Sequence, residues 1–234
     1  MVDPATLKAS VKVCMFDLYG TILDMQTGLR EAATPFLQGK GWTGNPDSFV
    51  TWWRRTHFEN SLIDSLLQRE HTPYREIGER SLAFVLERAG IAFSLAEVRA
   101  LVGEIEKLRP FPEVPAALQR LKARYALAVL SNGDRDMLET AKRHHGLFFD
   151  RVISVEEAGF FKPHRATYRK AAELQGAATD EILFVANHAF DCIGAKSAGM
   201  RTAFIDRRRR PFGHTPHQPD VIVPDMTALA GLIA

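Results

Sequence analysis

The sequence predicts an α/β fold, with a parallel β-sheet core and an all-helical unit inserted after the first strand. Short apolar, β-rich runs alternate with amphipathic helical patterns over the second half of the chain, which is typical of a parallel sheet covered on both faces. Residues 25–107 contain helical patterns and no convincing strand. With 234 residues, 46% hydrophobic content and a formal net charge of +2, the chain is long enough for one core and one inserted unit.

The expected strands are short apolar runs at 11–16, 126–131, 151–155, 181–186, 201–206 and 220–224. Helical patterns lie between the later runs, at 115–125, 135–146 and 165–176. The last two end at Gly146 and Gly176, which suit a left-handed helix cap. We expect residues 8–24 and 108–234 to form the core domain, with ligands at the carboxyl ends of its strands.

The inserted segment, residues 25–107, is predicted to be a helical cap domain. One of its helices is opened by a capping box, with Ser94 as the cap and Glu97 three residues later. Because the insertion directly follows the first strand and its turn, its simplest position is over the active end of the sheet.

Composition excludes several classes of protein. Only two cysteines occur, Cys14 and Cys192, both in apolar segments, so we expect no disulfide framework and a cytoplasmic location. No stretch approaches the roughly 18 apolar residues of a membrane span, and no histidine has metal-site spacing with another histidine or a cysteine. The one dense basic run, at 207–210, is interpreted as a solvated loop rather than a nucleic-acid patch.

Polar residues follow four successive strands and should therefore meet at one edge of the sheet. They are Asp17 after the first strand, Ser131 and Asn132 after the second, Lys162 after the third, and His188 and Asp191 after the fourth. Each alone has a structural explanation as a helix cap, a turn residue or a solvated side chain. Their joint occurrence in this order predicts a catalytic site.

The motifs "DLYGT" at 17–21, "SNG" at 131–133, "KP" at 162–163 and the loop ending in Asp191 resemble the haloacid dehalogenase superfamily. The resemblance spans nearly the whole chain and implies a Rossmann-like core with a cap. Most of that superfamily are phosphatases, whose first motif carries a second Asp as general acid; Tyr19 stands at that position here. Asn187 replaces one of the acids that hold Mg²⁺ in those enzymes, so both departures disfavour phosphoryl transfer.

The subfamily resembled is the type II 2-haloacid dehalogenases, whose first motif reads Asp-x-Tyr-Gly-Thr. Their cap carries an essential arginine in a Trp-Arg context, which "TWWRRTHFENSL" matches at Arg54. Tyr168, six residues after Lys162, matches a tyrosine of the "KP" motif. The alternative for Arg54 is an ordinary surface arginine of a helix.

The resemblance implies a reaction in which Asp17 attacks the α-carbon of a 2-haloalkanoate, and water then cleaves the aspartyl ester. The implied catalytic residues are Asp17, Thr21, Arg54, Lys162, His188 and Asp191. The implied substrate-binding residues are Leu18, Tyr19, Ser131, Asn132, Tyr168, Asn187 and Phe190. Ser131, Lys162 and backbone N–H groups after Asp17 would bind the carboxylate, and Arg54 with Asn132 would receive the halide. Thr21 would orient Asp17, Asp191 would hold Lys162 or position water, and no metal or cofactor is expected.

One motif departs from the subfamily pattern. Where typical type II enzymes have Ser-Ser-Asn, this chain has Ala186, Asn187 and His188, so a serine is lost and an asparagine becomes a histidine. His188 could take over water activation, or narrow the halide pocket and favour small substrates such as fluoroacetate and chloroacetate. The third alternative is a histidine bonded to a loop carbonyl without a catalytic role.

The leading interpretation is a metal-independent hydrolase of short 2-haloalkanoic acids. An azetidine-2-carboxylate ring-opening hydrolase and a Mg²⁺-dependent phosphatase are the alternatives. A non-catalytic binding protein is disfavoured by the joint presence of Asp17, Arg54 and Lys162. Related proteins are often homodimers through cap helices, and the apolar positions at 62–67 fit either such a dimer or internal cap packing.

Overall fold

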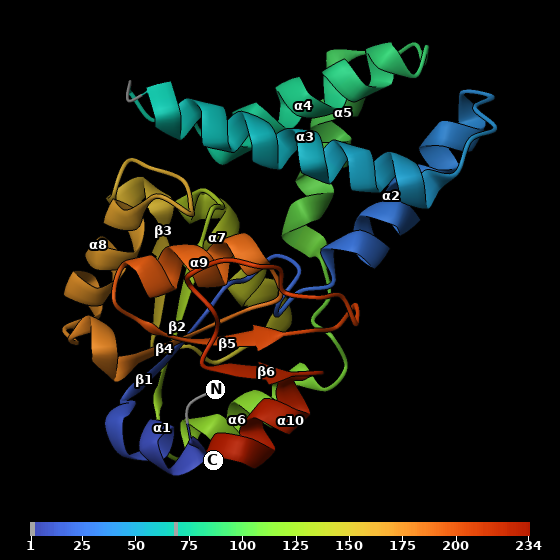
Figure 1. The fold of residues 1–234 in the computed structure, drawn as a ribbon. Coiled ribbons are helices and arrows are strands. Elements are labelled where there is room, and N and C mark those ends of the chain that lie inside the picture. The colour runs from blue at the N-terminus through green and yellow to red at the C-terminus, as the bar shows by residue number, and fades with distance from the viewer. Residues whose placement is uncertain (1–2, 68–69) are drawn as a thin grey trace.

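A computed structural model describes residues 3–67 and 70–234 of the chain (Figure 1). Six parallel strands form one sheet in the order β3-β2-β1-β4-β5-β6. Their bounds are β1 Val13–Phe16, β2 Ala126–Ser131, β3 Arg151–Ser154, β4 Ile182–Ala186, β5 Arg201–Ile205 and β6 Val221–Val223. The α/β parallel sheet predicted from the alternating runs is thus confirmed, and every predicted run contains one strand.

The centre of the sheet is its most buried part, because β1 lies between β2 and β4 and all three have apolar side chains on both faces. Two successive connections lead from β1 to β2 and β3 on one side, and the chain then crosses to β4 on the other. Strand order therefore reverses between β1 and β4, and the crevice beyond their carboxyl ends is the place where such sheets bind ligands. Asp17 follows β1 directly, and His188 follows β4 by two residues.

Helices surround this sheet. Those of the core are α1 Pro4–Ser10, α6 Val114–Lys122, α7 Arg135–His145, α8 Arg165–Gln175, α9 Ala189–Ser197 and α10 Met226–Ile233. The predicted caps are confirmed, since Gly146 after α7 and Gly176 after α8 have φ values of 61° and 70°. The helix predicted at 115–125 ends earlier, at Lys122. The first strand begins at Val13 rather than at Val11, which is the C-cap residue of α1.

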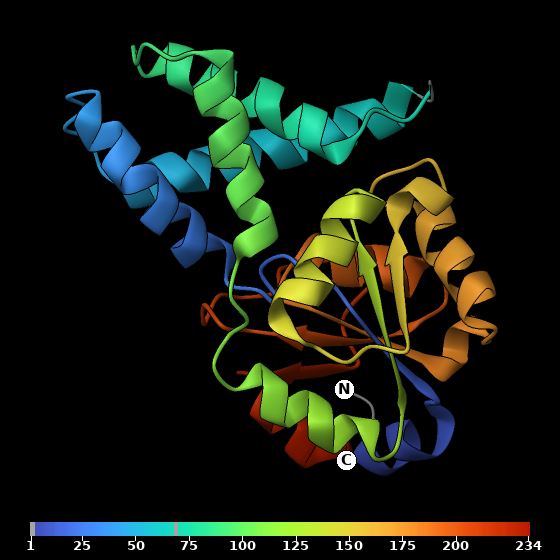
Figure 2. The same ribbon diagram turned by 180° about the vertical axis from the view of Figure 1, so that it is seen from behind.

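As predicted, residues 25–107 contain helices joined by short loops and no named strand where described. They form α2 Met25–Gly39, α3 Pro46–Leu67, α4 Tyr74–Arg88, α5 Leu95–Gly103 and the 3₁₀-helix η1 Glu104–Lys107. The capping box of Ser94 and Glu97 opens α5. Figures 1 and 2 show these helices standing on one side of the sheet, joined to it through residues 17–24 and 108–114. We call them the cap helices; the division into domains at residues 24 and 108 remains a prediction.

The cap helices are fastened to the core beside the sheet's carboxyl edge. The Asp134 carboxylate, in the loop before α7, accepts hydrogen bonds from the backbone N–H groups of Tyr74 at 2.6 Å and Arg75 at 2.9 Å. It therefore satisfies donors at the start of α4 that have no partner within that helix. A third hydrogen bond joins the Phe161 N–H to Ser65 Oγ at 2.8 Å. These contacts place α3 and α4 over the end of the sheet.

The apolar positions predicted at 62–67 divide between the two sides of α3. Leu62 is half-buried, whereas Ile63, Leu66 and Leu67 are 52%, 77% and 56% exposed. The internal-packing interpretation is therefore wrong for these three side chains.

Among the described residues, no helix is long and apolar enough to cross a membrane. Cys14 and Cys192 are buried free thiols.

Candidate active site

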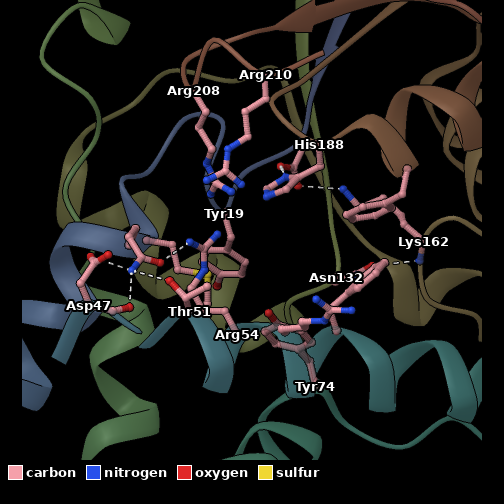
Figure 3. Close-up of a pocket in the computed structure, with 16 residues that line it drawn as sticks. Tyr19, Asp47, Thr51, Arg54, Tyr74, Asn132, Lys162, His188, Arg208 and Arg210 are labelled. Carbon is pink, nitrogen blue, oxygen red and sulfur yellow. Dashed lines mark hydrogen bonds and ion pairs between the residues drawn. The ribbon is translucent and has the colours of Figure 1, made fainter. Parts of the chain in front are cut away.

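A cavity of about 440 Å³ lies between the carboxyl edge of the sheet and the cap helices (Figure 3). The core contributes Asp17, Tyr19, Asn132, Lys162, His188, Phe190, Arg208 and Arg210 to its lining. The cap helices contribute Met25, Gln26, Asp47, Thr51, Arg54, Arg55, Phe58 and Tyr74. Its size is within the range of pockets that bind small organic ligands.

Asp17 lies at the bottom of this cavity with 6% of its surface exposed. Thr21 Oγ1 donates to its Oδ2 at 2.7 Å, Lys162 Nζ donates to its Oδ1 at 2.8 Å, and His188 Nδ1 lies 3.5 Å from Oδ2. Burial alone would raise the pKa of Asp17, but the Lys162 charge and the contact with His188 lower it below its usual range. Asp17 is therefore an anion at neutral pH, held in one orientation and open to the cavity.

Lys162 uses every hydrogen of its ammonium group within the protein. Besides Asp17 Oδ1, it donates to Asp191 Oδ2 at 2.7 Å and to the Leu130 carbonyl at 3.0 Å. Although burial opposes the charged form, the two carboxylates raise the pKa of Lys162. An ammonium group has three hydrogens, so Lys162 has no donor left for a substrate carboxylate while these bonds last.

Asp191 and Tyr168 support Lys162 from behind, out of contact with the cavity. The Tyr168 hydroxyl donates to Asp191 Oδ1 at 2.5 Å, and both side chains are fully buried. Burial raises the pKa of Asp191, against the opposing effect of the Lys162 charge. The chain Tyr168–Asp191–Lys162–Asp17 therefore fixes the position of the carboxylate that faces the cavity.

Several other predicted site residues also lie behind the cavity wall. Asn187 donates through Nδ2 to the Gly20 carbonyl and through its backbone N–H to Thr21 Oγ1, both at 2.9 Å, and so ties the loop after β1 to the end of β4. Ser131 is fully buried, and its Oγ accepts the Gly133 N–H at 3.3 Å. The Leu18 side chain lines a separate small apolar pocket.

Arg54 reaches the cavity from α3, so it is not a simple surface arginine. Its Nη1 donates to Gln26 Oε1 at 2.8 Å, and among the described residues its buried Nε has no hydrogen-bond partner. Burial, and next the charge of Arg208, lower the pKa of Arg54 to about 10. Gly20 leaves room for this group: a Cβ there would lie 3.3 Å from Arg54 Nη2 and 2.7 Å from His188 Cε1. The φ of +90° at Gly20 also favours glycine.

Aromatic side chains of both parts of the protein form the cavity walls. Tyr19 stacks on Tyr74 of α4 with ring centroids 6.0 Å apart, and Tyr74 stacks on His57 at 3.9 Å. On another side, Phe190 packs against Phe58 of α3 at 4.2 Å. Burial raises the pKa of Tyr19 well above its usual value, so the wall beside Asp17 is uncharged.

The basic run at 207–210 lies in a loop whose last three arginines are exposed, as interpreted from the sequence, but the loop also contacts the core and the cavity. Arg207 lies over the Phe111 ring at 3.8 Å and donates to Glu113 at 2.5 Å and to the Thr21 carbonyl at 3.0 Å. Arg208 and Arg210 line the cavity. The sequence contained a signal for this, because the run follows β5 and therefore lies at the edge of the sheet where the other site residues gather.

Cap residues that the sequence did not single out also line the cavity, among them Gln26, Phe58 and Tyr74. They come from three helices, and no local motif marks their convergence.

The donor set does not suit a divalent metal. Where Asp17 and Asp191 could share a cation, the Lys162 ammonium already bridges them at 2.8 and 2.7 Å. Asn187 gives its amide to the Gly20 carbonyl. Within residues 3–67 and 70–234, no three His, Cys, Asp or Glu side chains are grouped so that they could hold a metal ion.

Comparison with known proteins identifies the family of the chain. A family model of haloacid dehalogenase-like hydrolases matches residues 11–199. Haloacetate dehalogenase H-2 from Moraxella sp. (strain B) is 30% identical over 227 residues, which cover 96% of this chain and 98% of that protein. An (S)-2-haloacid dehalogenase from Pseudomonas sp. (strain YL) is 30% identical over 225 residues, covering 95% of this chain and 94% of that protein.

A solved structure gives the same result for the fold. The L-2-haloacid dehalogenase from Xanthobacter autotrophicus, with chloropropionic acid covalently bound, superposes with a TM-score of 0.83 and 27% sequence identity. The match covers 95% of this chain and 98% of that one. The family predicted from the motifs is therefore confirmed: the chain belongs to the haloacid dehalogenase-like hydrolases, and it resembles the 2-haloacid dehalogenases of that family in both sequence and fold.

Proposed function

We propose that this protein is a metal-independent 2-haloacid dehalogenase, which hydrolyses short 2-haloalkanoic acids through an aspartyl ester on Asp17. The observation that carries the proposal is the Asp17 carboxylate itself, which is buried, held as an anion by Lys162 and open to an aromatic-walled cavity. The covalent adduct in the Xanthobacter enzyme supports the same chemistry.

In the first step, a carboxylate oxygen of Asp17 attacks the α-carbon from the side opposite the halogen. The carbon–halogen bond breaks, and the halide leaves with the bonding electrons. In the second step, water attacks the carbonyl carbon of the Asp17 ester, the 2-hydroxy acid is released and the carboxylate is restored. The net reaction consumes one water and yields one halide and one proton.

The substrate carboxylate needs donors other than Lys162, whose hydrogens are already used. Within the described residues, the backbone N–H groups of Leu18 and Tyr19 donate to no carbonyl, and we assign the carboxylate to them. Asn132 is oriented by the bond that its Oδ1 accepts from the Lys162 N–H at 2.9 Å, and its Nδ2 donates to no other described residue. Together with the Arg54 guanidinium, which lines the cavity, that Nδ2 would receive the departing halide.

We assign water activation to His188. Its Nδ1 lies 3.5 Å from Asp17 Oδ2, so a water bound to this ring from the cavity would lie beside the ester carbon that it attacks. The ring also packs against Phe190, with centroids 5.5 Å apart, which fixes its position on the cavity side.

Haloacetates, including fluoroacetate, belong to the proposed range of substrates, in keeping with the similarity to a haloacetate dehalogenase.

Halide release tests the proposal. Chloroacetate, fluoroacetate and both enantiomers of 2-chloropropionate should be incubated, with chelator present, with the wild type and with Asp17→Asn. Release by the wild type alone is the expected result. Absence of release from every acid would contradict the proposal. Ring opening of azetidine-2-carboxylate, or chelator-sensitive hydrolysis of a phosphate ester, would then identify the alternative electrophile.

Two further assignments accompany this function. We propose a homodimer formed through the exposed face of α3 that carries Ile63, Leu66 and Leu67, and light scattering of the wild type beside Leu66→Lys would test it. We also propose a cytoplasmic location, supported by the two free thiols of Cys14 and Cys192.

A further inference from the structure

The loop after β5 brings two arginines into the cavity. Arg208 and Arg210 both line it, and Figure 3 shows their side chains reaching from the loop toward the region of Tyr19 and His188. They approach from the core, opposite Arg54, which comes from a cap helix. The cavity thus has cationic groups on two sides.

The loop is held in shape by bonds within it and to the core. The Arg209 N–H donates to the Asp206 carbonyl at 3.3 Å, and the Arg210 N–H donates to Asp206 Oδ1 at 2.9 Å. Arg207 is anchored to Glu113 and to the Thr21 carbonyl. Arg208 and Arg210 therefore project from a fixed turn that is tied directly to the catalytic loop.

The charges of these arginines are not neutralised by the protein. Within residues 3–67 and 70–234, the side chains of Arg208 and Arg210 have no hydrogen bond or ion pair, although Arg207 beside them has both. Burial, and next the charge of Arg210, lower the pKa of Arg208, while Asp24 and Asp47 act in the opposite direction. The charge of Arg208 also lowers the pKa of Arg54, so Arg208, although exposed, is repelled by a guanidinium group on either side.

The donors already assigned are enough for a simple haloacid. The Leu18 and Tyr19 N–H groups serve one carboxylate, and Arg54 with Asn132 serves one halide. Arg208 and Arg210 are additional to this set. The cavity of about 440 Å³ is also larger than a two-carbon acid needs. A second anionic group on the substrate would occupy the remaining space and relieve the repulsion.

We propose that Arg208 and Arg210 form a subsite for a second carboxylate, and that the preferred substrates are short 2-haloalkanedioic acids such as 2-chlorosuccinate. The inference rests on the proposed function. The chemistry is unchanged: Asp17 displaces the halide, water cleaves the ester, and the product is a 2-hydroxy dicarboxylate with one halide and one proton.

The test compares 2-chlorosuccinate with 2-chlorobutanoate, which has the same chain length but a methyl group in place of the second carboxylate. The variants are Arg208→Gln, Arg210→Gln and the double variant. Arg209→Gln is the matched control, since it removes the same charge from the same turn and Arg209 does not line the cavity. The quantity measured is the ratio of kcat/KM for the diacid to kcat/KM for the monoacid.

The wild type should favour the diacid, and each single cavity variant should lower the ratio about tenfold, as expected for loss of a charge-assisted hydrogen bond. Arg209→Gln should leave the ratio unchanged. An unchanged ratio in the double variant would overturn the inference. An equal fall of the ratio in Arg209→Gln would also overturn it, since the effect would then come from the overall positive potential of the loop rather than from a specific subsite.

A binding measurement separates failure of the inference from failure of the proposed function. Calorimetry with Asp17→Asn should show tighter binding of 2-hydroxysuccinate than of 2-hydroxybutanoate, and adding both Arg208→Gln and Arg210→Gln to that variant should abolish the difference. This result requires no turnover. Equal binding of the two hydroxy acids would refute the second subsite even if every haloacid released halide. Absence of halide from all acids would refute only the dehalogenase function.

Discussion

Lys162 Nζ lies 2.8 Å from Asp17 Oδ1, and their side chains are 1% and 8% exposed, so a buried ion pair stands at the bottom of the cavity. The same ammonium lies 2.7 Å from Asp191. One cation thus offsets two buried carboxylates. The nucleophile, its charge and its orientation all depend on this arrangement.

Replacing Lys162 by Met should abolish turnover and destabilise the fold. Two carboxylates would be left buried without a cation, at a cost of about 3–5 kcal/mol in the free energy of unfolding. Halide release and urea unfolding measure the two effects. Lys170→Met is a suitable control, because its pair with Glu173 is partly exposed and should contribute less than about 1 kcal/mol. Turnover by Lys162→Met within a few-fold of the wild type would be inconsistent with this role.

Asp17 should contribute stability that depends on pH in a predictable direction. Its pKa in the folded protein is lower than the value of about 3.9 in an unfolded chain, so the contribution is present above that value. It is lost as the pH falls through the lower, folded-state pKa. Asp191 has a raised pKa and the opposite sign. Urea unfolding of wild type and Asp17→Asn should therefore differ by a constant amount between about pH 8 and pH 5. Disappearance of the difference within that interval would argue against the ionised nucleophile.

His188→Asn tests water activation and restores the residue type that the subfamily pattern has at this place. Loss of a general base should slow ester hydrolysis by about 10²-fold or more, while the first step continues. Intact-protein mass spectrometry should then detect the ester on Asp17. His214→Asn, at an exposed position outside the cavity, serves as the control. Normal turnover by His188→Asn, with no accumulation of the ester, would contradict the role of His188 in water activation.

Asp134→Ala should loosen the contact between cap helices and core. Its carboxylate accepts the Tyr74 and Arg75 N–H groups, and removal of such a helix cap costs about 0.5–2 kcal/mol. Because Tyr74 lines the cavity, KM should rise more than kcat falls. Asp136→Ala is the comparison, since that exposed carboxylate bonds only the Arg75 side chain among the cap residues described. Equal effects of the two substitutions would show that Asp134 contributes no more than Asp136 to the contact between the cap helices and the core.

Much of the core could be predicted because its signals are local. Each strand is a short apolar run, and parallel strands bring their carboxyl ends to one edge, so Asp17, Lys162 and His188 could be grouped before the structure was known. Residues such as Tyr74 and Phe58 could not, since they reach the cavity through docking of the cap. That docking depends on pairs far apart in sequence, such as Asp134 with Tyr74.

Some of the substrate contacts predicted from the sequence are not available in the structure, for a related reason. Strand ends predict which residues are near one another, but not how hydrogen bonds are distributed among them. Lys162 and Asn187 were expected to touch substrate, yet their donors are used by Asp17, Asp191, Leu130 and Gly20. Arg208 and Arg210 were missed because a run of like charges usually means a solvated surface.

A single-turnover reaction in ¹⁸O-labelled water tests the aspartyl ester most directly. Enzyme in excess over a 2-chloroalkanoate should give an unlabelled 2-hydroxy acid in the first turnover, because its new oxygen comes from Asp17. The label should appear in the peptide that contains Asp17. Label in the product of that first turnover, with none in the peptide, would mean that water attacks the α-carbon directly and would contradict the proposed mechanism.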